Sequence, residues 1–247
     1  MLSAKSPVVC LDEGASDTDW ADYLLDVIPS LENGRKANKS ESGFIILPEN
    51  KRTARQKEAK IHTALVVLGG EDPASLSLPA AVSLAGCSLF TTVIAGDALK
   101  SKDMRSKIPE ALSKFVRVEE PVPNLRERLC EFDLVVTHYG FTAFEASAAG
   151  CAVILLGTTP LHENLAKKYG FKCLAASSVN KDSFQKLLSD RESLYQDVSS
   201  SAIEPLDKFI LNLSQGQKLM CPVCRENGNT EWHKDLLAAR TAERTFR

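Results

Sequence analysis

Six short apolar runs recur along the chain from residue 64 onward, at intervals of about 20 residues. They lie at 64–68, 90–95, 114–118, 133–137, 151–156 and 172–176. Polar stretches with helix-forming patterns separate them, and this alternation is typical of strand–helix units that build a parallel sheet. We therefore predict an α/β fold, with a Rossmann-like parallel sheet and helices on both faces.

Four of the intervening stretches read as helices, and three of them end in glycine, as a helix C-terminus often does. They lie at 72–86, 124–132, 142–150 and 161–170. The run at 151–156 is continuously apolar, which favours a central strand buried on both faces.

The first 60 residues follow a different pattern. A strand-like run at 7–11 leads straight into an acidic turn, although a buried parallel strand needs neighbours on both sides. We predict that residues 1–60 are a partial first domain and linker, and that the chain starts within a fold. Inside this part we expect a polar loop, a strand and a basic linker, at 30–43, 44–48 and 49–60. The main α/β domain is predicted at 61–215, and a separate tail at 216–247.

Composition narrows the function. With 247 residues and 44% apolar residues, the chain is long enough for one large or two modest domains with a buried core. A formal charge of −2 provides no field that favours nucleic acid or an anionic membrane. No apolar run approaches the roughly 20 residues of a membrane span, and the N-terminus lacks a secretion signal. We expect a cytoplasmic protein that binds neither nucleic acid nor membrane.

The first candidate loop follows the run at 64–68. Gly69 and Gly70 permit a tight turn, and Asp72 is expected to cap the next helix with Pro73 at its first position. A helix N-terminus at the end of a parallel strand can bind a phosphate. An ordinary capped turn explains the same residues, because a glycine pair is a weak signal.

The second candidate loop is "HYGFTAFE", residues 138–145, after the run at 133–137. Thr142 and Glu145 have the spacing of a capping box, in which each side chain bonds the amide of the other residue. A carboxylate one turn inside such a helix also suits the two hydroxyls of a ribose. Position alone leaves both interpretations open.

The third loop, "LHENLA", follows the run at 151–156. It places His162, Glu163 and Asn164 at the same end of the sheet, where amide and carboxylate groups suit sugar hydroxyls. The alternative is the solvated start of a helix.

In this order and spacing, the three loops resemble the nucleotide-binding domain of GT-B-type nucleotide-sugar enzymes. The chain is most similar to the UDP-sugar hydrolases of pseudaminic acid biosynthesis and, more distantly, to the peptidoglycan N-acetylglucosaminyltransferases. The resemblance covers about residues 7–215, and the sequence "GGEDP" favours the hydrolases. It implies a UDP-sugar ligand whose diphosphate is bound by the first loop, at Gly69, Gly70 and Asp72. The phosphate and ribose would be bound by the second loop, at Gly140, Phe141, Thr142 and Glu145. The sugar would be bound by Glu163 and Asn164 of the third loop.

The chain also departs from this family. Leu165 stands where relatives commonly have glutamine, and His138 and Tyr139 stand where they have small residues. The family's histidine base lies in the first domain, and none of the four histidines here matches its context, so the catalytic residue is unknown.

The sequence leaves alternative functions open. The chain is either a UDP-sugar hydrolase or glycosyltransferase of bacterial surface-glycan or nonulosonic-acid biosynthesis, or a non-catalytic nucleotide-sugar-binding segment of a larger fused protein. An unrelated α/β domain whose loops only cap helices is the third alternative.

The tail contains the "CPVC" pair Cys221 and Cys224, which has the spacing of a zinc knuckle. Structural zinc needs four ligands, and His233 is the nearest candidate for a third. The tail resembles the zinc-binding start of sugar-pathway methyltransferases, which implies a fused or neighbouring methyltransferase. The alternative is a tail with two free thiols.

Overall fold

The structure, a computed structural model, describes residues 9–11, 21, 23–28, 39–40, 45–53, 60–70, 72–96, 98–198, 206 and 208–209. The chain divides into two compact units, Met1–Ile45 with Ser200–Arg247, and Ile46–Ser199.

The second unit is built on a six-stranded sheet in which every pairing is parallel. Its strands are β4 (Thr63–Val66), β5 (Phe90–Ile94), β6 (Val116–Glu119), β7 (Leu134–Thr137), β8 (Ala152–Gly157) and β9 (Lys172–Ala175). The order is β6-β5-β4-β7-β8-β9, which is that of a doubly wound Rossmann sheet. All six strands coincide with the apolar runs of the sequence, so the predicted fold class is confirmed.

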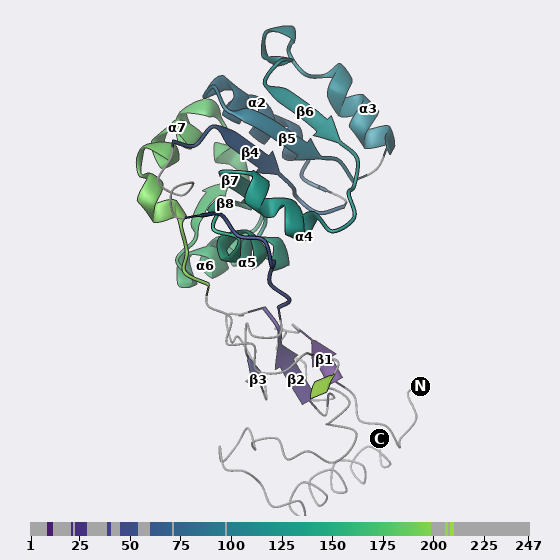
Figure 1. Ribbon diagram of the computed structural model, residues 1–247, viewed down its shortest axis with the longest axis vertical. Coiled ribbons are helices and arrows are strands. Elements are labelled where there is room, and N and C mark those ends of the chain that lie inside the picture. Colours follow the sequence, from purple (N-terminus) through teal and green to yellow (C-terminus); the bar gives the residue numbers. More distant parts are fainter. Residues whose placement is uncertain are drawn as a thin grey trace, which may run out of the picture. The chain divides into compact units, whose positions relative to one another are not determined.

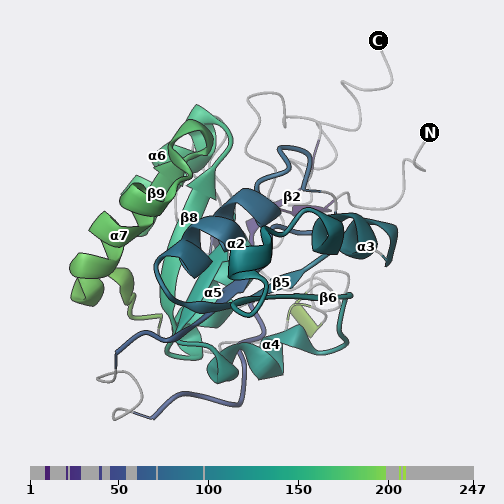
Figure 2. The same ribbon diagram turned by 90° about the horizontal axis from the view of Figure 1, so that it is seen from above.

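Helices cover both faces of this sheet (Figures 1 and 2). The helix α2 (Ser77–Gly86) packs on β4 and β5, and α7 (Lys181–Ser189) packs on α2. On the other face, α5 (Phe141–Ala148) packs on β7 and β8, and α6 (Pro160–Lys168) on β8 and β9. The helix α3 (Ala98–Ser106) packs on β6, and α4 (Leu125–Arg128) continues into a 3-10 turn (Leu129–Glu131) before β7.

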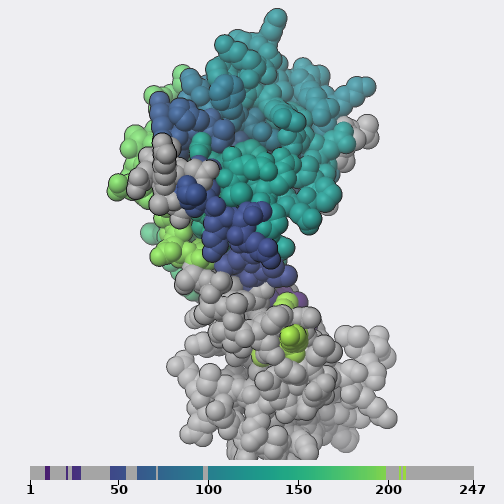
Figure 3. Space-filling model, viewed as in Figure 1, coloured from purple at the N-terminus to yellow at the C-terminus, as the bar shows by residue number. Residues whose placement is uncertain are grey.

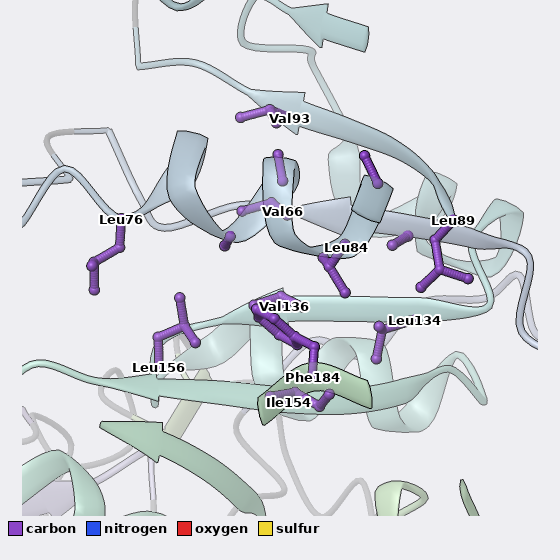
Figure 4. Close-up of a cluster of buried hydrophobic side chains, with 14 of the residues drawn as sticks. Val66, Leu76, Leu84, Leu89, Val93, Leu134, Val136, Ile154, Leu156 and Phe184 are labelled. Atoms are coloured by element: carbon purple, nitrogen blue, oxygen red, sulfur yellow. The ribbon is translucent and has the colours of Figure 1, made fainter. Parts of the chain in front are cut away.

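Every second residue of the central strands belongs to the hydrophobic core under α2 and α7. Val66, Val136 and Ile154 lie in one cluster with Leu84 of α2 and Phe184 of α7 (Figure 4). The residues between them in the strands are also fully buried and face α5 and α6, because successive side chains alternate across a sheet. This burial on both faces explains why the strands read as continuous apolar runs.

Two of the three predicted glycine stops are confirmed. Gly150 and Gly170 follow α5 and α6 with φ of 84° and 77°, a conformation that favours glycine. Gly86 instead lies within α2, and Ser88 takes the left-handed conformation with φ of 65°.

Two helices were not anticipated. The helix α3 has the sequence "ALKSKDMRS", which carries too few apolar residues for a periodic pattern. The helix α7 is amphipathic, and Asn180 caps it by accepting a hydrogen bond from the amide of Ser183 at 2.9 Å. No helix among the described residues is long and apolar enough to cross a bilayer.

In the first unit, the described residues include a small parallel sheet of order β1-β2-β3. Its strands are β1 (Val9–Leu11), β2 (Tyr23–Asp26) and β3 (Lys39–Ser40). The strand expected at 7–11 is therefore present, while β3 lies within the predicted polar loop. The strand predicted at 44–48 is wrong, because residues 45–50 have no regular strand structure. The sequence at 201–214 also has a helix-forming pattern, but this segment falls mostly outside the described residues.

Residues 46–53 belong to the second unit and lie along α4. The amides of Glu49 and Asn50 donate to the carboxylate of Glu127 at 3.0 and 3.3 Å, and the amide of Arg52 donates to the carbonyl of Ala149 at 2.8 Å. In the space-filling view this blue-violet segment lies against the teal surface of α4 (Figure 3).

Asp133 joins this segment to the start of the sheet. Its carboxylate accepts the amides of His62 and Thr63, both at 2.8 Å, and the Thr63 hydroxyl at 3.0 Å, and it forms a salt bridge with Arg52. Burial alone would raise the pKa of Asp133, but these donors and the Arg52 charge outweigh it and hold the pKa below its ordinary value.

Candidate functional site

The order of the strands creates a topological switch point at the carboxyl edge of the sheet, the edge at which the strands end. The chain reverses direction across the sheet between β4 and β7, and ligands of open parallel sheets bind at such a switch point. The three predicted loops follow β4, β7 and β8, which are adjacent. With strands roughly 4.8 Å apart, the loops span about 10 Å, a length that one dinucleotide-sized ligand can cover.

The first loop turns at Gly69, whose φ is 75°. Asp72 bonds the start of the next helix, as expected, but the expected first position at Pro73 is wrong, because α2 begins at Ser77. Asp72 has a φ of 39°, and its carboxylate accepts the amides of Leu76 and Ser77 at 3.0 and 2.9 Å. The first amides of α2 are therefore already occupied by a side chain of the loop.

Two residues that the sequence did not single out complete the first loop. A Cβ atom added to Gly96, in the loop after β5, would lie 1.7 Å from the carbonyl oxygen of Gly70. Lys100 of α3 donates from its ammonium group to the same oxygen at 3.3 Å. The loop after β5 thus supports the glycine turn and brings a cation to it.

The second loop starts α5 in a different way. Its N-cap is Gly140, in extended backbone with φ of 168°, and no side chain caps the helix. The predicted capping box of Thr142 and Glu145 is wrong, because the helix begins one residue earlier, at Phe141, and Thr142 lies inside its first turn. The amide of Ala143 donates to the carbonyl of Gly140 at 3.0 Å, so the amides of Phe141 and Thr142 are the donors that α5 presents at the switch point.

Glu145 lies one turn further along α5 and is half-buried. Burial raises its pKa above the ordinary value, Arg126 of α4 opposes this rise, and Glu127 adds to it. No cap bond holds its carboxylate. The side chain therefore offers two acceptor oxygens near the start of the helix.

The third loop leads into α6, whose N-cap Thr159 accepts the amide of His162 at 3.3 Å, with Pro160 in the first position. Glu163 and Asn164 are exposed in this first turn. The stem of Glu163 passes close to Gly157, where an added Cβ atom would lie 2.6 Å from it.

A histidine pair links the second and third loops. The rings of His138 and His162 stack with centroids 6.0 Å apart. Nδ1 of His138 lies 2.9 Å from the carbonyl oxygen of Leu156, and Nδ1 of His162 lies 3.0 Å from the Thr158 hydroxyl. Sequence reasoning placed His162 in the third loop, but the pairing of two residues from separate elements left no signal in the sequence.

The ring of Tyr139 packs against other aromatic rings of the domain. Its ring meets Phe144 and Phe171 edge to face, with centroids at 5.7 and 6.3 Å. The bulk of this residue, unusual for the family that the sequence resembles, therefore belongs to the apolar layer beside α5.

A pocket of about 720 Å³ lies elsewhere, at the opposite edge of the sheet, where the strands begin. Its lining includes Lys60, Cys87, Lys181 and Arg191. Strand ends and helix starts converge instead at the carboxyl edge, where the start of α5 has no side-chain cap.

The predicted metal ligands Cys221 and Cys224 lie outside the described residues, as does His233. Within the part of the chain that the structure describes, no group of three or more histidine, cysteine or acidic residues is arranged to hold a metal ion.

Comparison with known proteins identifies the fold. No protein-family model and no curated protein matches the chain. Among solved structures, MurG of Acinetobacter baumannii matches 85% of this chain and 67% of its own, at 16% identity and a TM-score of 0.56. MnaA of S. aureus, in a structure with UDP, matches 85% of this chain and 70% of its own, at 12% identity and a TM-score of 0.55. Anabaena HepE, in complex with UDP and glucose, matches 85% of this chain and 71% of its own, at 10% identity and a TM-score of 0.52.

At these identities the matches show the fold. The six-stranded sheet with its helices is Rossmann-like and corresponds to half of a GT-B fold. The chain spans about two thirds of the length of MurG.

Proposed function

We propose that this chain binds a UDP-sugar at the carboxyl edge of β4, β7 and β8 and processes it as a GT-B-type hydrolase or glycosyltransferase. The carrying observation is the start of α5, where an uncapped helix begins at Gly140 on the switch point of the sheet. By contrast, Asp72 and Thr159 cap the helices of the two flanking loops.

The other loop residues fit the parts of such a ligand. The amides at the start of α5, with the turn at Gly69 and Gly70, suit the diphosphate. The carboxylate of Glu145 suits the ribose hydroxyls, and Glu163 and Asn164 suit the sugar. Phe141, which is 45% exposed at the first position of α5, offers an apolar ring beside them.

The comparisons support this proposal at the level of fold and ligand class. Two proteins of the same fold, MnaA and HepE, are described with UDP. We place the reaction in the cytoplasm and in bacterial surface-glycan or nonulosonic-acid biosynthesis, as the sequence resemblance implies. In either reaction a general base would take a proton from water or a sugar hydroxyl, whose oxygen bonds to the anomeric carbon of the sugar while UDP leaves.

Gly140→Ala tests the binding site directly. A Cβ atom at Gly140 meets no atom within 4 Å and the φ is extended, so alanine fits the free protein. A bound phosphate would occupy that space. We expect calorimetric titration with UDP-N-acetylglucosamine to show at least about tenfold weaker binding, with an unchanged melting temperature.

Gly86→Ala is the matched control, because Gly86 ends α2 and its nearest contact is the flexible side chain of Lys181 at 3.3 Å. It should keep wild-type affinity. Equal affinity of Gly140→Ala and wild type would count against binding at α5.

A non-catalytic nucleotide-sugar-binding segment is the second candidate. It is favoured by the described residues of the first unit, which include no histidine to act as the base that related enzymes have there. Incubation with UDP-N-acetyl sugars and analysis of the products distinguishes the two: free UDP indicates the enzyme, and binding without turnover indicates the segment.

A further inference from the structure

The histidine pair has one ring nitrogen on each residue left for a ligand. A carbonyl oxygen only accepts, so Nδ1 of His138 carries the proton that it donates to Leu156. Nδ1 of His162 is bonded to the Thr158 hydroxyl. Each Nε2 is therefore the atom through which the pair can bind a further group.

The pair lies between the parts of the proposed site. His138 directly precedes the turn at Tyr139 and Gly140, and His162 directly precedes Glu163 and Asn164. In a UDP-sugar, the group between the nucleotide and the sugar is the diphosphate, so a phosphate oxygen falls nearest to the pair.

In the free protein, the surroundings of His162 disfavour a positive charge on its ring. Burial and the neighbouring His138 lower the pKa of His162, so its ring is neutral at neutral pH. Among the neighbouring titratable groups, Tyr139 follows His138 in the loop, Glu163 follows His162 on α6, and Cys173 of β9 lies close to Glu163. Burial raises the pKa of Cys173 to about 11, with Glu163 adding to the rise, so this thiol stays neutral as well.

We propose that His138 and His162 bind the diphosphate together and take up a proton when they do so. The inference rests on the proposed function and adds two residues to its site. An imidazolium donates a charge-assisted hydrogen bond to a phosphate oxygen, and the two negative charges of the diphosphate favour the charged form of His162 against burial and the neighbouring His138. The affinity for the ligand therefore rises as the pH falls.

Calorimetric titration with UDP-N-acetylglucosamine at pH 6 and pH 8 measures this linkage. Both phosphates of the probe are esterified, so its own charge stays constant over this range. We expect about three- to tenfold tighter binding at pH 6, with proton uptake revealed by buffers of different ionisation enthalpy. His138→Gln and His162→Gln should each reduce the pH dependence, whereas His62→Gln, an exposed control at the opposite edge of the sheet, should retain it.

A measurement on the wild-type chain tests the role of the histidine pair even if the variants do not fold. NMR titration of the histidine rings should show the pKa of His162 rising when UDP-N-acetylglucosamine binds. Binding that is equally tight at pH 6 and pH 8, or an unmoved His162, overturns the role of the pair and leaves the proposed function standing. No binding at either pH overturns both.

Discussion

Glu145 shows how a single residue of the proposed site is set by its surroundings. Its carboxylate is half-buried and its pKa is raised, which is unfavourable for the free protein at neutral pH. A structural carboxylate is usually held by donors, as Asp72 and Asp133 are. A ligand with paired hydroxyls would give Glu145 the donors that the fold withholds.

Glu145→Gln should separate ligand binding from stability. Loss of a charge-assisted acceptor should weaken binding of UDP-N-acetylglucosamine about ten- to hundredfold, measured by calorimetry. The folded-state pKa is raised, so the wild type loses stability as the pH rises through it and the charge forms. The variant avoids this loss, and its free energy of unfolding should exceed that of the wild type at pH 7, by less than about 1 kcal/mol after solvent screening.

The gain in stability of Glu145→Gln over the wild type should disappear at pH 4, where the wild-type carboxyl is protonated in the folded state. Thermal melts at the two pH values provide this check. A variant that is less stable than the wild type at pH 7 would show that Glu145 holds the fold together instead.

At the scale of elements, the sheet was predictable and the helix starts were not. A parallel strand is buried on both faces, so its sequence is a continuous apolar run such as 151–156. Helix starts depend on which of several small polar residues supplies the cap. The sequence pattern placed the start of α5 at Thr142, one residue after its observed start at Phe141. It placed the start of α2 at Pro73, four residues before its observed start at Ser77.

Asp133 is expected to stabilise the junction of β4, β7 and residues 46–53. Asp133→Asn should lower the free energy of unfolding by about 2–4 kcal/mol, because it removes the charge opposite Arg52 and one acceptor of the amides. The folded-state pKa is depressed, so this stability is present above the unfolded pKa of about 3.9 and is lost as the pH falls through the folded value.

Urea unfolding at pH 7 and pH 3 measures the effect, and the difference between wild type and variant should narrow at pH 3. Asp103→Asn is the control, since Asp103 forms an exposed pair with Lys107 on α3 and should change stability by no more than about 0.5 kcal/mol. Equal effects of the two substitutions would contradict the account.

The contact between the loops after β4 and β5 requires a glycine. Gly96→Ala places a Cβ atom against the backbone of Gly70, so the loop must shift, at about 1–3 kcal/mol, and ligand affinity should fall with it. Gly70→Ala meets no atom within 4 Å and should melt like the wild type. Thermal melts compare the two, and an unchanged Gly96→Ala protein would show that the loops are not in contact.

Across the whole molecule, the sequence placed the three candidate loops at one edge of the sheet, but it did not identify the side chains from other elements that meet them there. Strand ends and glycine turns are local, so Gly69, Gly140 and Asn164 could be placed on one edge from the sequence. Lys100 reaches a carbonyl 30 positions away, and His138 meets His162 from another element. Such contacts depend on the order of strands in the sheet, which the apolar runs do not specify.

Amide NMR shifts on titration of the isotope-labelled chain with UDP-N-acetylglucosamine test the central claim most directly, because they report both binding and its place. The account predicts the largest shifts at Gly69, Gly140, Thr142 and Asn164. Shifts confined to the pocket at the opposite edge, around Lys60, Cys87 and Lys181, or no shifts at millimolar ligand, would contradict it.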